Sequence, residues 1–290
     1  MKNNNRWLGA AVVAGMLSIL LPSRSAEAQI FVTLKAEATR YLLYEPLQVT
    51  VTLRNELGVP LILNSGEGSA DLAFEIEQSP GRPLRPAAGR AAAEPRTVEP
   101  WKTETLTIDL LREYEILRPG PYRIVARVTV GGIDFLSTPA LVDVLPGLEI
   151  VRTTAMAEDG SRRVLSLRTL VRDRHDYAFI QILDEDRSVC YATHNIGSII
   201  RHFKPLLQVS SDQTVHTLHQ SAPTRYTHSV TRLNGQPVAI TYYSTSPVET
   251  ARFRADRRGV LRVEGVLPYR GDPVVEPVRP PPSDRNVPSR

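Results

Sequence analysis

The feature that most constrains the fold is a strict alternation of apolar and polar residues in short runs, which is clearest in residues 47–55. The apolar positions of this run are Leu47, Val49, Val51 and Leu53. A period of two places these side chains on one face of an extended chain, which predicts a half-buried β-strand. Pro and Gly residues bound the run on both sides, as turns do. Because similar runs recur along the chain, we predict an all-β fold.

The first 28 residues have the order of a secretory signal peptide. Lys2 and Arg6 precede an apolar run over residues 7–21, and the small-residue site Ala26-Glu27-Ala28 follows it. The apolar run is shorter than the roughly 20 residues that a spanning helix needs. We therefore predict cleavage before Gln29, a periplasmic or extracellular location, and no integral membrane span in the mature chain. The alternative is an uncleaved membrane anchor.

The mature chain is nearly neutral. Loss of residues 1–28 would remove three basic residues and one acidic residue, so that 35 basic and 31 acidic residues become 32 and 30. Without a basic stripe there is no electrostatic footprint for nucleic acid. Cys190 is the one cysteine, which excludes an intramolecular disulfide and a multi-cysteine metal site. Its apolar surroundings predict a buried, inert thiol. The sequence leaves the oligomeric state open.

Residues 29–146 are predicted to form the first domain. Alternating runs separated by turn residues favour a β-sandwich. Residues 79–100 contain five prolines and are predicted to form a long exposed loop, because proline cannot donate to a strand ladder. The predicted strands lie near residues 30–36, 47–54, 60–64, 71–77, 104–110, 121–130 and 133–144.

A Pro-Gly turn at residues 119–120 delivers Tyr122 to the start of a strand. This arrangement resembles the tyrosine corner of immunoglobulin-like sandwiches, in which the hydroxyl bonds to upstream backbone. With about seven strands, residues 30–145 resemble a bacterial immunoglobulin-like or fibronectin type III-like module. They are also loosely similar to the BsuPI-type proteinase inhibitor sandwich, through a strand that ends in Asn55 and the later Pro-Gly-x-Tyr. The resemblance implies an architecture and no ligand.

The second half is predicted to contain a linker or hairpin tip at residues 147–163, a second β domain at 164–270 and a disordered Pro-rich tail at 271–290. Asn234-Gly235 predicts a type I′ hairpin turn. Asp-led turns before apolar runs recur at Asp186, Asp212 and Asp256, like propeller blades, but the length is too short for four blades. We expect a second sandwich or a meander. Its predicted strands lie near residues 164–172, 177–183, 187–193, 206–209, 213–220, 225–233, 236–243, 249–254 and 259–266.

All six histidines lie in the second half, at positions 175, 194, 202, 216, 219 and 228. His216 and His219 are three residues apart on a predicted strand and therefore point to opposite faces. His228 lies on the neighbouring strand, where it could approach His216. Metal binding and ordinary cross-strand packing are both open, and we favour packing.

No Gly-x-Ser-x-Gly, His-Glu-x-x-His or phosphate-cradling loop occurs in the chain. The acids Asp184, Glu185 and Asp186 are better explained as turn formers than as a glycosidase pair. We therefore assign no catalytic, cofactor-binding or metal-binding residue, and no cofactor. Arg270-Gly271-Asp272 matches a tripeptide recognised by integrins, but three-residue matches arise by chance.

Two functions from different classes remain open. The first is an exported, noncatalytic binding or scaffold protein of the bacterial periplasm or cell surface, with a protein or glycan partner. The alternative is a metal-dependent or hydrolytic enzyme that uses the histidine-rich second domain.

Overall fold

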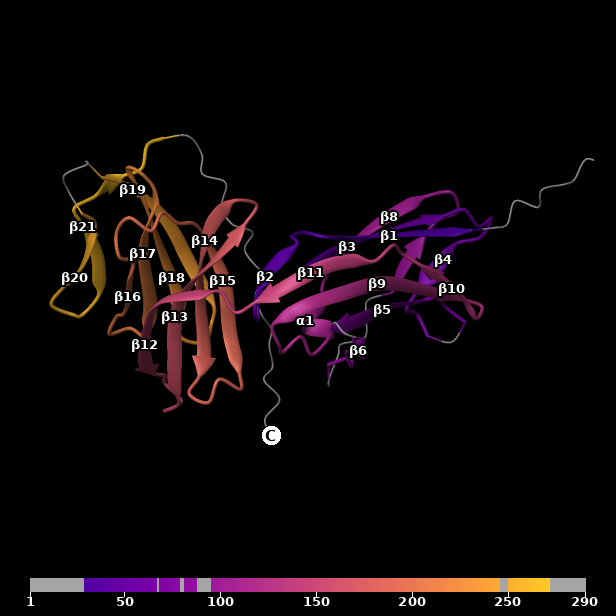
Figure 1. The fold of residues 1–290 in the computed structure, drawn as a ribbon, viewed down its shortest axis with the longest axis horizontal. Coiled ribbons are helices and arrows are strands. Elements are labelled where there is room, and N and C mark those ends of the chain that lie inside the picture. Colours follow the sequence, from indigo (N-terminus) through magenta and orange to yellow (C-terminus); the bar gives the residue numbers. More distant parts are fainter. Residues whose placement is uncertain (1–28, 67, 79–80, 88–94, 246–249, 272–290) are drawn as a thin grey trace, which may run out of the picture.

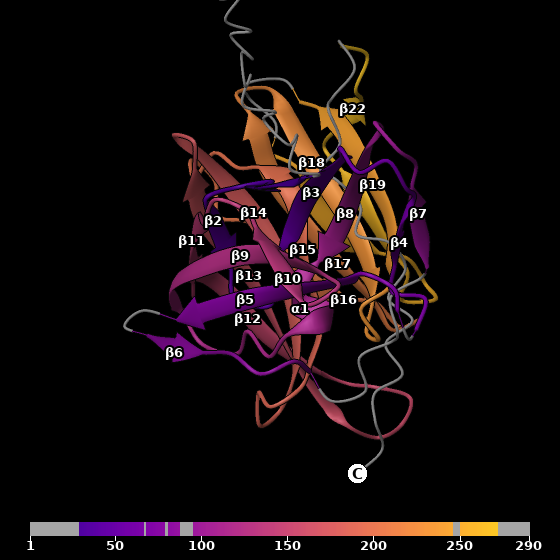
Figure 2. The same ribbon diagram turned by 90° about the vertical axis from the view of Figure 1, so that its right-hand side faces the viewer.

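The computed structural model describes residues 29–66, 68–78, 81–87, 95–245 and 250–271. These residues form several β-sheets and one short helix, α1 (Leu110–Glu113), so the predicted all-β class is confirmed. Two β bodies lie end to end in Figure 1, and the first lies in front of the second when the view is turned (Figure 2). The predicted signal peptide and residues 272–290 of the predicted tail lie outside the described residues. Within the described residues, no helix is long and apolar enough to cross a membrane.

The first body pairs a three-stranded sheet, in the order β1-β3-β8, with a larger sheet in the order β2-β11-β9-β5-β6. Strand β10 pairs with β9, and β4 pairs with β7. All neighbours run antiparallel except β2 and β11, which are parallel. The strands are β1 (Ile30–Ala36), β2 (Arg40–Leu42), β3 (Gln48–Asn55), β4 (Leu61–Leu63), β5 (Asp71–Gln78), β6 (Arg82–Pro83), β7 (Arg96–Val98), β8 (Thr103–Asp109), β9 (Gly120–Val130), β10 (Ile133–Leu136) and β11 (Ala140–Leu145).

Strand β3 shows why the sequence folds this way. Its alternate residues Val49, Val51 and Leu53 are fully buried, and they pack in one core with apolar side chains of β5 and β9 from the other sheet. At the end of β3, the buried Asn55 amide donates to the Val59 and Val98 carbonyls, and its oxygen accepts from a backbone N–H. The strand predicted near residues 47–54 is therefore confirmed.

The tyrosine-corner geometry is also present. Tyr122 is buried at the start of β9, and its hydroxyl donates to the Arg118 carbonyl at 2.6 Å. Burial raises the pKa of the Tyr122 hydroxyl, so the group keeps its proton for this bond. This contact ties the turn before β9 to the core of the first body.

The predicted loop at residues 79–100 is only partly correct. Residues 82–83 form β6, and residues 96–98 form β7, which pairs with β4. Val98 is buried in the core. Short strands of two or three residues escape a sequence pattern, because they carry too few positions to show a period of two.

The second body consists of two antiparallel sheets, in the orders β12-β13-β14-β15 and β16-β17-β18-β19-β22, with a separate hairpin β20-β21. Apolar residues of β13, β14 and β15 pack against Val215, Leu207 and Leu233 to form its main core. The strands are β12 (Leu148–Met156), β13 (Arg162–Arg172), β14 (His175–Asp184), β15 (Cys190–Ser198), β16 (Leu206–Val209), β17 (Thr214–Ala222), β18 (Arg225–Arg232), β19 (Pro237–Ser244), β20 (Arg252–Ala255), β21 (Leu261–Glu264) and β22 (Leu267–Pro268).

The region predicted as a linker, residues 147–163, contains strand β12. This strand pairs with β13 over its whole length, and the hairpin tip lies at residues 157–161. The strand is an edge strand with no fully buried side chain, and the polar run that begins at Arg152 resembles a linker. The hairpin-tip interpretation of Asp159-Gly160 is confirmed, and the linker interpretation of residues 148–156 is wrong.

The turn predicted at Asn234-Gly235 is not type I′. The Gly235 N–H donates to the Arg232 carbonyl, and only Gly235 of the pair has a positive φ, +91°. These features describe a three-residue loop with glycine in the left-handed position, whereas type I′ needs positive φ at both central residues. Such a pair occurs instead at Asp173 (+49°) and Arg174 (+67°), between β13 and β14.

Four hairpin tips of the second body share one backbone pattern. In the tips at 157–161, 210–214, 232–236 and 256–260, the fourth residue donates to the first carbonyl and the first donates to the fifth. The fourth residue has a positive φ in each: Gly160, Gln213, Gly235 and Gly259. The Asp-led echoes of the sequence at Asp212 and Asp256 are therefore repeated turns, and the body is not a propeller.

Candidate functional site

The structure disperses most of the histidines. His175 and His202 are exposed, the latter beside Phe203. A ring nitrogen of His194 lies 2.6 Å from the Gly235 carbonyl, and one of His219 lies 3.1 Å from the Ser198 carbonyl. These contacts explain two histidines as cross-sheet hydrogen-bonding groups.

His216 and His228 do come together, as their strands predicted. His216 Nδ1 lies 3.0 Å from His228 Nε2, and the rings stack with centroids 5.2 Å apart. Phe253 of the β20-β21 hairpin packs its ring against both. His216 and His219 indeed face opposite sides of β17, because one contacts Phe253 and the other contacts β15.

The His216–His228 pair continues into a polar chain. His216 Nε2 lies 2.8 Å from the Thr214 hydroxyl, which donates to the Asp212 carboxylate at 2.7 Å. Burial lowers the pKa of His228 to about 4, and His216 adds to this effect. Burial also lowers the pKa of His216, against the attraction of Asp212. Among the residues that the structure describes, no three His, Cys, Asp or Glu side chains are grouped to hold a metal ion.

The buried histidines predict acid sensitivity. Burial lowers the pKa of both His219 and His228 to about 4 from 6.5, so the unfolded chain binds protons first as the pH falls. Stability should therefore be lost between about pH 6.5 and about pH 4, by roughly 1–2 kcal/mol per histidine at pH 5. Urea unfolding at a series of pH values measures this slope.

His228→Gln is the matched variant, and it should flatten the slope while the exposed His175→Gln leaves it unchanged. Chelator should not change the melting temperature at any pH, because a ligand that binds only the native state would shift it. A stoichiometric metal lost in His228→Gln, or a slope unaffected by that substitution, would contradict this account of the pair.

Cys190 and the acids at 184–186 make local contacts. Cys190 is only half-buried, with Sγ 3.5 Å from the Thr193 hydroxyl, so the predicted full burial is wrong. The strand register shifts beside it, between Ile182 and Leu183 of β14. Asp184 accepts from the Ser188 hydroxyl and the Val189 N–H, and Glu185 pairs with Arg162. The acids are turn formers, as expected.

Of Arg270-Gly271-Asp272, the last residue lies outside the described range.

The most elaborately built polar site is the junction between the two bodies, where β2 reaches the boundary in Figure 1. Leu42 of β2 is buried with Leu170 and Phe179 of the second body. Gly147 adopts a φ of +65°, and a Cβ there would lie 2.9 Å from the Thr169 carbonyl oxygen. Leu42 is thus held in a close-fitting apolar socket. Glycine is required at position 147, where the chain passes from the first body to the second.

A buried ion pair lies beside this socket. Arg172 at the end of β13 contacts Glu45 at 2.6 Å, and both side chains are nearly inaccessible, at 13% and 10% exposed. The guanidinium also lies over the rings of Tyr41, Tyr177 and Phe179, 5.5 to 5.9 Å from their centroids. Burial raises the pKa of Glu45, while Arg172 and the Leu42 N–H oppose that rise. Charge, ring faces and hydrogen bonds therefore converge on one guanidinium.

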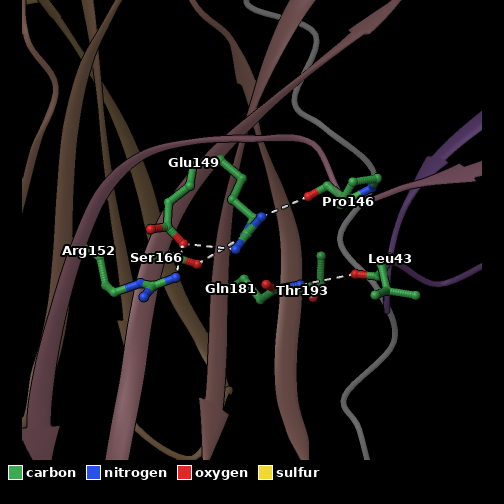
Figure 3. Close-up of polar contacts among 8 residues, drawn as sticks. Leu43, Pro146, Glu149, Arg152, Ser166, Gln181 and Thr193 are labelled. Carbon is green, nitrogen blue, oxygen red and sulfur yellow. Dashed lines mark hydrogen bonds and ion pairs between the residues drawn. The ribbon is translucent and has the colours of Figure 1, made fainter. Parts of the chain in front are cut away.

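A second set of polar contacts crosses the junction (Figure 3). The Gln181 amide donates to the Leu43 carbonyl at 3.0 Å and to the Thr193 hydroxyl at 3.2 Å. Arg168 donates to the Pro146 carbonyl and to Glu149. These bonds tie Leu43 of the first body to β14 and Pro146, which precedes β12, to β13. The junction is therefore held at a second place besides the ion pair.

A small cleft of about 220 Å³ opens at this junction. Its walls include Tyr41, Glu45 and Arg172 on one side and Thr193 and His194 on the other. Sequence reasoning missed this site because Glu45 and Arg172 are 127 residues apart. The one available signal was Tyr44-Glu45-Pro46 at a strand entry.

Comparisons with known proteins give little. No family model matches the chain, and no curated protein matches it. Among solved structures, the periplasmic chaperone SfaE is similar over 72% of this chain and 98% of its own, with 9% identity and a TM-score of 0.23. A DUF4784 family protein from Bacteroides caccae covers 82% of this chain and 84% of its own, with 7% identity and a TM-score of 0.20. Neither similarity is close enough to assign a function.

Proposed function

We propose that the protein is an exported, noncatalytic binding or scaffold protein of the bacterial periplasm or cell surface. It holds two β domains at a fixed orientation and engages a protein or glycan partner. The first domain, residues 29–146, supplies an immunoglobulin-like or fibronectin type III-like module, and the second lies within residues 147–270. Export rests on the signal-peptide pattern of residues 1–28, which the mass of the secreted chain tests.

The observation that carries this proposal is the locked junction. Domain interfaces within one chain usually permit relative motion unless they are large or well anchored. Here the Arg172–Glu45 pair, the Leu42 socket and the Gln181 and Arg168 bonds all act against such motion. A fixed orientation keeps surfaces of both domains in register for one partner, which lowers the entropy lost on binding.

The first domain also presents an edge to a partner. Within the described residues, β8 pairs only with β3, so its other backbone edge carries no strand. An unpaired edge strand is a template for strand addition by an extended peptide. This edge favours a protein partner for the first domain.

The test is capture followed by cross-linking. The mature chain should retain one partner from periplasmic or surface extracts, and cross-links should join that partner to both domains. Arg172→Ala should weaken capture because it loosens the orientation, whereas the exposed-pair variant Arg162→Ala should not. Capture that is equally strong in Arg172→Ala, or cross-links confined to one domain, would contradict a role for the fixed orientation.

One observation favours the enzyme alternative, namely the polar chain from Asp212 through Thr214 to His216 and His228. A carboxylate that orients a base is a recurring catalytic arrangement. Phe253 packs against both imidazoles, however, and the one hydroxyl that His216 contacts, that of Thr214, donates its proton to Asp212. Turnover in a broad hydrolase screen that disappears in His228→Ala would establish this alternative and overturn the noncatalytic proposal.

A further inference from the structure

Three of the four repeated hairpin tips enclose a depression at one end of the second body. It has a volume of about 440 Å³ and is lined by residues of the tips at 157–161, 210–214 and 232–236, together with Arg163. Hairpin tips usually project separately into solvent. Here three strand connections far apart in sequence converge on one concavity.

Arg163 forms a built wall of this depression. It is 5% exposed, its guanidinium bonds to Asp159 at 2.9 Å, and it stacks 3.8 Å from the ring centre of Tyr191. Its buried Nε–H has no hydrogen-bond partner in the described part of the chain. A buried donor left without a partner is costly, roughly 1–3 kcal/mol, and is expected to be satisfied by a water or another bound group.

Two of the three carboxylates of the depression are already committed. Asp159 accepts from Ser161 and from Arg163, and Asp212 accepts from Ser210 and Thr214. These internal bonds fix both side chains and lower the pKa of each carboxyl. Glu158 is the one lining carboxylate without a partner among the described residues, so the depression is a poor site for a divalent cation, which needs several free oxygen ligands.

The remaining polar side chains of the depression are those of Glu158, Gln213, Arg232 and Asn234. Neither the Gln213 amide nor the Arg232 guanidinium bonds to a described side chain, and Asn234 uses only its oxygen, which accepts from the Gln236 N–H. Together these side chains supply both donors and acceptors to the depression. The charges of Arg163 and Arg232 are offset by those of Glu158, Asp159 and Asp212, so the site does not select an anion.

We propose that this depression binds a neutral saccharide unit of a glycan. A sugar hydroxyl both donates and accepts hydrogen bonds, which matches fixed amide, guanidinium and carboxylate groups around one concavity. The half-buried Ala157 adds a small apolar contact for the C–H groups of a sugar ring. This inference rests on the proposed binding function and gives it a second site, with a ligand class, in the second domain.

The backbone provides a clean test variant. Gln213 has a φ of +61°, so Gln213→Gly removes the amide at a position where glycine is favoured. Arg187 has a φ of +59° in another tip of the same body and does not line the depression, so Arg187→Gly is the matched control. Arg232→Ala removes the exposed guanidinium.

The experiment is saturation-transfer NMR of the mature chain with methyl glycosides of glucose, galactose, mannose and N-acetylglucosamine, each tested alone, with glycerol as the reference polyol. At least one glycoside should receive saturation from the protein. In heteronuclear NMR spectra of the labelled chain, the same glycoside should shift the amide signals of the three tips. The Gln213→Gly, Arg232→Ala double variant should weaken binding about tenfold or more, and Arg187→Gly should not.

Absence of binding by all four glycosides, or binding unaffected by the double variant, would overturn the inference. The proposed function would survive that result if the mature chain still captured a protein partner that cross-links to both domains. Loss of capture together with loss of glycoside binding would instead remove both.

Discussion

Replacement of Arg172 by alanine should lower the free energy of unfolding by about 3–5 kcal/mol, because it leaves the Glu45 carboxylate buried without its partner. The pair is 2.6 Å apart and almost inaccessible to water. The substitution also removes the stem and guanidinium from three aromatic faces. Urea unfolding of the mature chain measures the loss.

Arg162→Ala is the matched control. Arg162 and Glu185 are 3.1 Å apart, but their side chains are 51% and 61% exposed. Exposed pairs contribute little, so this variant should change stability by less than about 1 kcal/mol. The double variant Arg172→Met, Glu45→Leu should recover much of the loss, since it leaves no buried charge alone. Equal effects of Arg172→Ala and Arg162→Ala would show that the junction contributes little to stability.

Tyr122→Ala should destabilise the first domain by about 3–5 kcal/mol, because it leaves a cavity where a buried ring was packed. Tyr122→Phe should cost about 0.5–1.5 kcal/mol, because it keeps the ring and removes only the hydroxyl that bonds to the carbonyl of the exposed residue Arg118. The two variants therefore separate the ring from its hydrogen bond in one urea series.

Tyr191→Phe serves as the control for loss of a hydroxyl. Tyr191 is half-buried under the Arg163 guanidinium, and no hydrogen bond of its hydroxyl to a described residue is present. Its loss should change stability by only a few tenths of a kcal/mol. If Tyr122→Phe were as mild as Tyr191→Phe, the corner hydrogen bond would have no energetic role.

Much of the fold follows from sequence because the strands carry their own period and punctuation. Val49, Val51 and Leu53 alternate with polar residues and are bounded by turn residues, so strand β3 was predictable. Tyr122 was predictable because a Pro-Gly turn precedes it. The approach of His216 to His228 followed from placing the two residues on neighbouring strands of a hairpin.

The other features of the fold depend on contacts between distant residues, which a local sequence pattern does not predict. Strand β12 lies at a sheet edge and shows no strict alternation of apolar and polar residues, so it resembled a linker. The turn type at Gly235 is set by the register of its strands, and the positive-φ pair falls on Asp173 and Arg174, without a glycine. The junction joins residues more than a hundred positions apart. The depression depends on three tips whose convergence only the sheet order determines.

The fixed orientation of the two domains is tested most directly by residual dipolar couplings of backbone amides, measured throughout the mature chain in one aligned sample. A locked junction predicts that one alignment tensor fits the amides of both domains, and that Arg172→Ala separates the fit into two tensors. Two different tensors in the unmodified chain would mean that the domains reorient freely, and would contradict the account of a rigid two-domain binding protein.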